Sequence, residues 1–376
     1  MTLDIIQIIF FFSFPLLTIL LSKKFKIFKW LSPVILCYAV GLLFANVSFF
    51  EVNNSLASTI SKIAIPLAIP LLLFSTDFIK WLKYAKSTVL SFLLCVISVT
   101  ICTLIAFQFF SDTNNESWKI AGMLIGVYTG GTPNMSAIGL SLHVNEETFI
   151  LLNAGDLFIC GIYLIFLMTF AQSLLLKFLP SFKSKYKASE IQEMNLDKQK
   201  KNFGKIKDYL ISSGISVLIL LIGVGLSYLI KNNISVIIII LTVTTLGIAS
   251  SFSNKIKKLN YSFELGEYLL LIFCVAIGSL ADFRELINNS STIFLFLAVV
   301  MISSVLLHYF LAWIFRIDAD TVIITSTAAI FSPAMVAPIS SVLKNREILI
   351  SGLTTGLVGY AIGNYLGILI AYFLKP

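Results

Sequence analysis

The chain has 376 residues, of which 58% are hydrophobic and only 12% are charged, and its mean hydropathy is +0.95. This composition excludes an ordinary soluble globular domain and predicts an all-α, polytopic membrane protein whose surroundings are the lipid bilayer. The formal net charge of +8 does not indicate a nucleic-acid partner, because the lysines lie in short loops between apolar segments, where they set membrane orientation.

Ten apolar stretches are each long enough to cross about 30 Å of hydrocarbon. Lysines rather than a cleavage site follow the first stretch, so we expect it to be retained as a span and not removed as a signal peptide. The five cysteines lie in apolar segments and are expected to be free, buried thiols. The stretches lie near residues 5–21, 33–50, 56–75, 87–110, 148–178, 209–229, 234–250, 264–281, 292–315 and 346–374.

Two further segments, 119–142 and 319–342, are apolar but interrupted. The first contains the run YTGGTPNMSAIG from Tyr128, and the second contains STAAIFSPAMVAPISS from Ser326. Glycine, proline and polar residues at membrane depth leave backbone groups unpaired, which is tolerated only inside protein or beside water. Paired interruptions in two halves of a chain indicate the binding site of a transporter.

The distribution of the lysines and arginines favours two re-entrant segments over two full crossings. With both interrupted segments returning to the side they enter from, most of the 27 Lys and Arg residues face the cytoplasm, whereas two full crossings place most of them outside. We therefore predict two inverted repeats of five transmembrane helices plus one re-entrant or broken helix each, 1–179 and 209–376, joined by a cytoplasmic basic linker, 180–208. Both termini are then extracytoplasmic.

Asp156 is the only acidic residue deep within an uninterrupted span, and Asn153 precedes it by three residues on the same helical face. A carboxylate at that depth is costly unless it binds a cation or a proton. We expect Asp156 and Asn153, with carbonyl groups freed between Thr129 and Asn134, to form an oxygen-rich site for Na⁺ or a site that exchanges H⁺. No other cofactor is expected.

The tips of the two interrupted segments are the predicted solute site. Helix N-termini near Asn134 and Ala334 are expected to present free N–H groups to an anion. The candidate substrate-binding residues are Thr129, Gly130, Gly131, Thr132, Pro133, Asn134, Ser136, Ser326, Thr327, Ser332, Pro333 and Ala334.

The run from Gly126 to Gly139, GVYTGGTPNMSAIG, followed by Asn153-Ala-Gly-Asp156, resembles the YjcL-like family of uncharacterised bacterial integral membrane proteins. That family is similar in organisation to the wider group of glutamate, citrate and bile-acid sodium symporters and cation/proton antiporters. The resemblance implies a bacterial cytoplasmic (inner) membrane location, inverted repeats, and an acidic residue, here Asp156, that binds Na⁺ or H⁺.

The function expected from these features is secondary active transport, with Na⁺- or H⁺-coupled symport of a small anionic organic solute. A cation/proton antiporter and a non-transporting membrane sensor or assembly protein are the alternatives, and a homodimer is one assembly that the sequence leaves open. An enzyme is not expected, because a second intramembrane aspartate, a serine elbow, HExxH, a P-loop and a Rossmann fingerprint are all absent from the sequence.

Overall fold

A computed structural model describes the chain over ten ranges, within which every regular element is a helix. The described ranges are 2–24, 33–46, 52–74, 76, 86–183, 205–259, 261–280, 290–331, 333–345 and 347–376. The long helices are α1 (Thr2–Lys24), α3 (Pro33–Asn46), α4 (Asn54–Leu73), α6 (Lys86–Phe110), α9 (Glu146–Thr169), α12 (Lys205–Lys231), α13 (Val236–Ser251), α15 (Ser262–Gly278), α17 (Ser290–Ile314) and α20 (Ile348–Leu374). The shorter elements are η1 (Ser111–Thr113), α7 (Ser117–Gly130), α8 (Thr132–Ser141), α10 (Ala171–Leu175), α14 (Asn254–Lys257), α18 (Ala319–Phe331), η2 (Pro333–Met335) and α19 (Val336–Val342).

Each of the ten predicted apolar stretches coincides with most of one long helix. Seven helices of the described ranges are long and apolar enough to cross a membrane, whereas α3, α13 and α15 have 14, 16 and 17 residues. The five cysteines are free and buried, as predicted. Most of the basic linker, together with the loops after α1 and α4 and before α17, lies outside the described residues.

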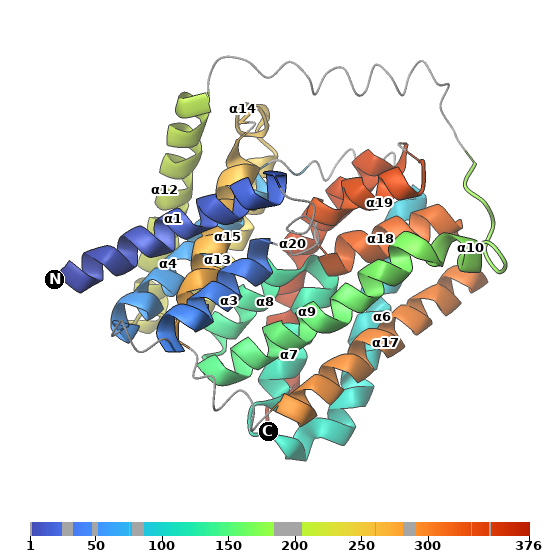
Figure 1. The fold of residues 1–376 in the computed structure, drawn as a ribbon, viewed down its shortest axis with the longest axis horizontal. Helices are drawn as coiled ribbons and strands as arrows, with labels where there is room; N and C mark the ends of the chain where they lie inside the picture. The colour runs from blue at the N-terminus through green and yellow to red at the C-terminus, as the bar shows by residue number, and fades with distance from the viewer. Residues whose placement is uncertain are drawn as a thin grey trace.

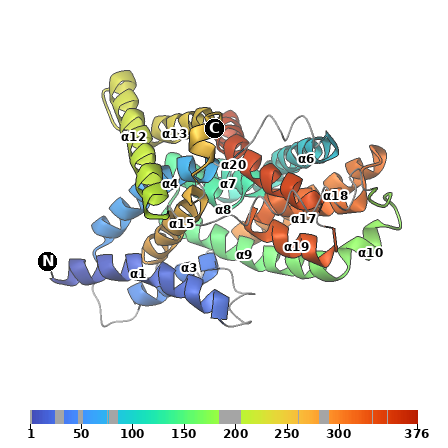
Figure 2. The ribbon, with the colours of Figure 1, turned by 90° about the horizontal axis from the view of Figure 1, so that it is seen from above.

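The helices form two bundles (Figures 1 and 2). Bundle A consists of α1, α3, α4, α12, α13 and α15, with α4 and α15 packed against each other at its centre. Bundle B consists of α6 to α10 and α17 to α20, with α7 against α20 and α6 against α17. Contacts within each bundle are far more extensive than those between them, where α13, α4 and α15 meet α8, α20 and α9.

Both bundles contain helices from both halves of the sequence. In each half, three long helices enter bundle A, and a further helix, a broken segment and a last helix then enter bundle B. The same order of elements therefore occurs twice, and the two halves are interleaved in space (Figure 1).

The first interrupted segment is a helical hairpin, hairpin 1, formed by α7 and α8. At its tip, Gly131 has φ 88° and ψ −171°, a conformation that is essentially restricted to glycine. The arms pack together, since Gly126 on α7 meets Ile138 on α8. At the open end, the Glu116 carboxylate accepts the Asn145 N–H at 3.1 Å, so the chain returns to where the hairpin began.

Hairpin 2 comprises α18, η2 and α19, and its open end is closed in a similar way. Asn345 Nδ2 donates to Asp320 Oδ2 at 2.9 Å, joining the end of the hairpin to its first turn. Gly352 of α20 lies against both arms, because a Cβ built there would meet Ile324 of α18 and, at 2.8 Å, Val336 of α19. Both interrupted segments thus turn back on themselves.

One glycine-lined face of α20 holds the two hairpins together. Its glycines follow at intervals of three or four residues, so they share one side of the helix. A Cβ built on Gly356 would lie 2.8 Å from the Pro333 ring at the tip of hairpin 2, and one built on Gly359 would overlap the Thr129 carbonyl oxygen near the tip of hairpin 1. Because Gly356 and Gly359 are three positions apart on one helix, the two tips that they contact lie side by side.

Replacing a glycine at this contact should destabilise the protein. We expect Gly359→Ala to lower the stability by about 1 to 3 kcal/mol, because the added methyl group overlaps backbone that cannot move freely. A methyl group at Gly225 on α12 meets nothing within 4 Å, so Gly225→Ala should be neutral or stabilising by up to about 1 kcal/mol. The unfolding temperatures of the two purified variants test this; equal temperatures would contradict the proposed close packing.

Candidate functional site

The first part of the site is the tip of hairpin 1, where it rests on α20. Asn134 is 1% exposed and reaches across to α20, where its Nδ2 donates to the Tyr360 carbonyl at 3.1 Å and to the Gly359 carbonyl at 3.4 Å. Gly363 makes room for this contact, since a Cβ there would overlap Asn134. The Asn134 side chain therefore fastens the tip to α20.

The backbone at this tip differs from the prediction of free N–H groups near Asn134. The N–H groups of Asn134 and Met135 both donate to the Gly131 carbonyl, at 3.1 and 3.3 Å. Pro133 has no N–H to offer. The Gly131 carbonyl thus accepts the N–H groups of Asn134 and Met135, which are therefore not free at the tip.

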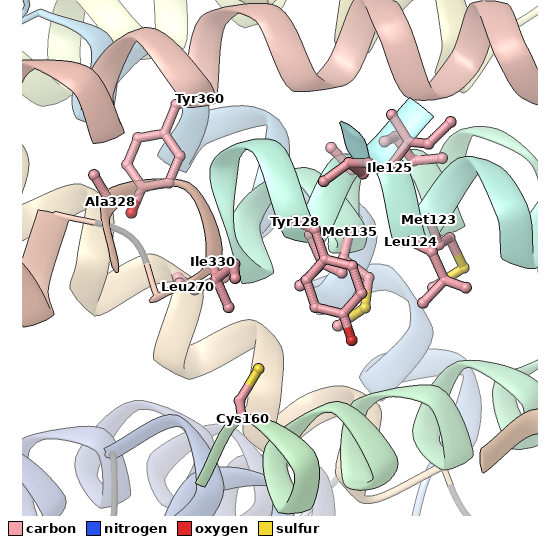
Figure 3. Packing of buried hydrophobic residues seen from close by; sticks show 14 of the residues in the cluster. Met123, Leu124, Ile125, Tyr128, Met135, Cys160, Leu270, Ala328, Ile330 and Tyr360 are labelled. Carbon is pink, nitrogen blue, oxygen red and sulfur yellow. The ribbon is translucent and has the colours of Figure 1, made fainter. Parts of the chain in front are cut away.

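Asp156 lies in the middle of α9 and faces hairpin 1. It is 6% exposed, and the Cys160 thiol donates to its Oδ1 at 3.2 Å. Its other polar neighbour is the Tyr128 phenol, three residues before Gly131, whose buried oxygen makes no hydrogen bond of ordinary geometry. Figure 3 shows the Tyr128 ring extending from α7 toward α9, where Cys160 lies. Among the described residues, the polar neighbours of the carboxylate are therefore one thiol and one phenol.

The predicted oxygen cage is formed only in part. The structure brings Asp156 to α7, but the Asn153 amide donates to the Phe149 carbonyl of its own helix at 2.8 Å. The Thr129 hydroxyl likewise donates to the Ile125 carbonyl at 2.7 Å. Both side chains are buried and make no hydrogen bond to the carboxylate, and their role in ion binding stays a prediction.

Hairpin 2 carries its polar side chains toward other helices of bundle B. The hydroxyl groups of Ser326 and Tyr163 on α9 lie 2.6 Å apart, and Tyr163 also meets the Tyr309 hydroxyl of α17 at 2.7 Å. The Phe331 ring at the end of α18 stacks on Tyr163 with 5.9 Å between the centroids. Asp156, Cys160 and Tyr163 share one face of α9, so this face joins hairpin 1 to hairpin 2.

The remaining predicted residues of hairpin 2 have separate positions. Thr327 donates to the Ile323 carbonyl at 2.7 Å within its own helix. Pro333 lies against Gly356 on α20. Ser332 is outside the described residues, as is the side chain of Ala334.

Some side chains around the predicted residues were not predicted from the sequence. One is Ser91 on α6, whose hydroxyl lies 2.6 Å from the Thr325 hydroxyl and 3.2 Å from the His308 ring. The spacing of Asp156, Cys160 and Tyr163 on one helical face was the available signal for Tyr163. No local pattern pointed to Ser91, because its partners are more than two hundred residues away in sequence.

A cavity of about 720 Å³ lies at the open end of hairpin 2, away from the tips. It is lined by residues of α10, the segment after α10 and the end of hairpin 2. On its wall, Asp320 is 7% exposed and accepts hydrogen bonds from Gln172 Nε2 at 2.8 Å and Asn345 Nδ2 at 2.9 Å. Through the bond from Gln172, Asp320 ties hairpin 2 to α10. The nearby Asp318 carboxylate accepts the Thr321 N–H at 2.8 Å, and burial raises the pKa of Asp318.

Apolar helices of membrane-spanning length, with broken segments packed inside them, define a multi-pass integral membrane protein. The sequence profile of the family described as "Protein of unknown function (DUF819)" matches residues 10–376, and the chain belongs to this family. It is also 25% identical over 357 residues to the uncharacterized membrane protein YjcL of Bacillus subtilis (strain 168), covering 90% of each chain. The expected YjcL-like family is thus confirmed.

The hydrogen bonds of Asp320 should contribute measurably to stability. We expect Asp320→Ala to lower the stability by about 1 to 3 kcal/mol, because two half-buried amide groups lose their carboxylate acceptor. Asp112 is exposed in the turn after α6 and accepts only from Ser111, so Asp112→Ala should have little effect. Thermal unfolding of both variants measures the difference, and an unchanged Asp320→Ala protein would show that these bonds do not hold hairpin 2.

Proposed function

We propose that the protein is a secondary active transporter that moves a small anionic organic solute by Na⁺- or H⁺-coupled symport. The observation that carries this proposal is the meeting of two hairpin tips, one from each half of the chain, on α20 beside a buried carboxylate. Irregular backbone at such a place is typical of the substrate and ion sites of transporters.

Alternating access is supported by the two-bundle architecture. Both hairpins belong to bundle B, and the contacts between the bundles are few compared with those inside them. Bundle B can thus shift against bundle A while the tips keep their packing on α20. The repeated order of elements and the lysine distribution support two inverted repeats, with both termini outside the bacterial inner membrane.

The proposed coupling residue is Asp156. A carboxylate in the middle of a membrane helix is costly unless it binds a cation or a proton. Its described neighbours are the Cys160 thiol and the Tyr128 phenol, neither of which carries a compensating positive charge. Binding of Na⁺ or H⁺ would neutralise the carboxylate and remove this cost, which links ion binding to the conformation of hairpin 1.

The proposed solute is anionic because the tip of hairpin 1 lies at the N-terminal end of α8 and carries no carboxylate of its own. A helix N-terminus has a partial positive charge that favours an anion. Asp156 faces α7, so the cation and the solute would have separate positions. The same lone carboxylate also supports the second candidate, a cation/proton antiporter without an organic solute.

Transport by the reconstituted protein tests the coupling assignment. In proteoliposomes screened with amino acids, dicarboxylates and keto acids, we expect uptake that depends on a Na⁺ or H⁺ gradient. Asp156→Asn should remove the gradient dependence, because the amide neither titrates nor neutralises a cation. Proton movement driven by Na⁺ without any solute would favour the antiporter.

A matched control is Glu147→Gln, which neutralises an acid in the first turn of the same helix, far from the tips. It should retain gradient-driven uptake. Uptake by Asp156→Asn with an unchanged gradient dependence would disprove the coupling role of Asp156.

A further inference from the structure

Two buried hydroxyl groups meet on the side of hairpin 1 that faces bundle A. The Tyr38 hydroxyl of α3 lies next to the Ser136 hydroxyl of α8 and the Cys274 thiol of α15. Neither the Tyr38 nor the Ser136 oxygen makes a hydrogen bond of ordinary length, although both oxygens are buried and Ser136 is 0% exposed. This pair was not apparent from the sequence, because Tyr38 lies almost one hundred residues before Ser136.

Buried hydroxyl groups without partners are uncommon. Nine-tenths or more of buried polar groups in proteins have a hydrogen-bond partner, so a group without one calls for an explanation. Buried hydroxyl groups elsewhere in the described chain, those of Thr129, Thr244 and Thr327, donate to carbonyls of their own helices. Ser136 has the same opportunity on α8, but its oxygen makes no such bond and lies among the groups that interact with Tyr38.

The chemistry of the cluster indicates what would bind there. The groups that interact with the Tyr38 hydroxyl are the Ser136 hydroxyl and the thiols of Cys274 and Cys37. Each can donate a hydrogen bond, and no carboxylate or ammonium group is among them. The N-terminal end of α8 lies one turn before Ser136, and its partial positive charge favours an acceptor with negative charge.

We propose that Tyr38 and Ser136 bind a carboxylate oxygen of the transported solute, at the boundary between bundle A and hairpin 1. This proposal rests on the proposed function and names a specificity-determining pair for it. Tyr38 belongs to bundle A and Ser136 to bundle B, so a bound carboxylate bridges the two bodies whose relative movement would give alternating access. The position is distinct from Asp156, which faces the α7 arm of the same hairpin.

Two conservative variants, Tyr38→Phe and Ser136→Ala, test the pair in the purified full-length protein. The probes are succinate, citrate, glutamate and pyruvate, each in NaCl, and the readouts are the dissociation constant and the unfolding temperature without probe. For the probe that the wild type binds best, we expect each variant to have a dissociation constant at least about tenfold higher than the wild type, as for a lost hydrogen bond to a charged group. Without probe, the unfolding temperature should stay equal or rise, because a buried hydroxyl without a partner is removed.

The double variant and a control separate this role from simple packing. If both hydroxyl groups bind one oxygen, the double variant should be weakened by less than the product of the single effects. The control is Tyr365→Phe on α20, whose hydroxyl lies 2.7 Å from that of Thr245. It should show the opposite pattern, a lower unfolding temperature with unchanged binding.

The outcomes also distinguish this proposal from the transport proposal. Binding of a carboxylate probe by the wild type and equally, within twofold, by both variants would overturn the role of Tyr38 and Ser136 and leave anionic-solute transport standing. If no carboxylate probe binds the wild type, the anionic solute and this site are overturned together.

Discussion

The close approach of the α20 backbone to the two hairpins is the contact on which the rest of the structure depends. Two irregular tips can exist inside a membrane protein only if other protein surrounds them, since lipid cannot satisfy their backbone groups. Small residues allow helices to approach at backbone distance. Gly359 and Gly363 meet Thr129 and Asn134, and Gly356 meets Pro333, so one helix face supports both tips. Any side chain at these positions would separate the tips that define the candidate site.

The two hairpins differ in how their polar side chains are satisfied. Hairpin 2 is joined by Ser326 and Thr325 to hydroxyl groups on α9 and α6, and by Asp320 to α10. Hairpin 1 is fastened to α20 by Asn134, while Tyr128 and Ser136 carry buried oxygens without partners. Hairpin 1 thus keeps unpaired hydroxyl groups beside Asp156 and Tyr38, whereas the polar groups of hairpin 2 are bonded mainly to other helices of bundle B.

Much of this arrangement could be predicted from the sequence, because it follows from local signals. Gly131 and Pro133 in an apolar segment required a turn inside protein, and Asp156 was recognisable as a buried acid in a span. The α20 glycines were visible too, but only their partners reveal what they do. Tyr38 and Ser91 could not be found, since their roles come from contacts with residues remote in sequence. The N–H groups of Asn134 and Met135, which were expected to be free, donate instead to the Gly131 carbonyl, a local turn geometry that the residue types alone do not specify.

The interleaving of the two halves has a consequence for biogenesis. When the ribosome has completed the first half, α4 still lacks α15, and hairpin 1 still lacks the glycine face of α20. Bundle A therefore cannot close before α15 is inserted, and bundle B cannot close before α20, the last helix, is inserted. The nascent chain must keep the backbone of the first tip shielded until then, by water or by the insertion machinery, and a protein truncated before α20 would have an unfinished bundle B with no glycine face for either tip.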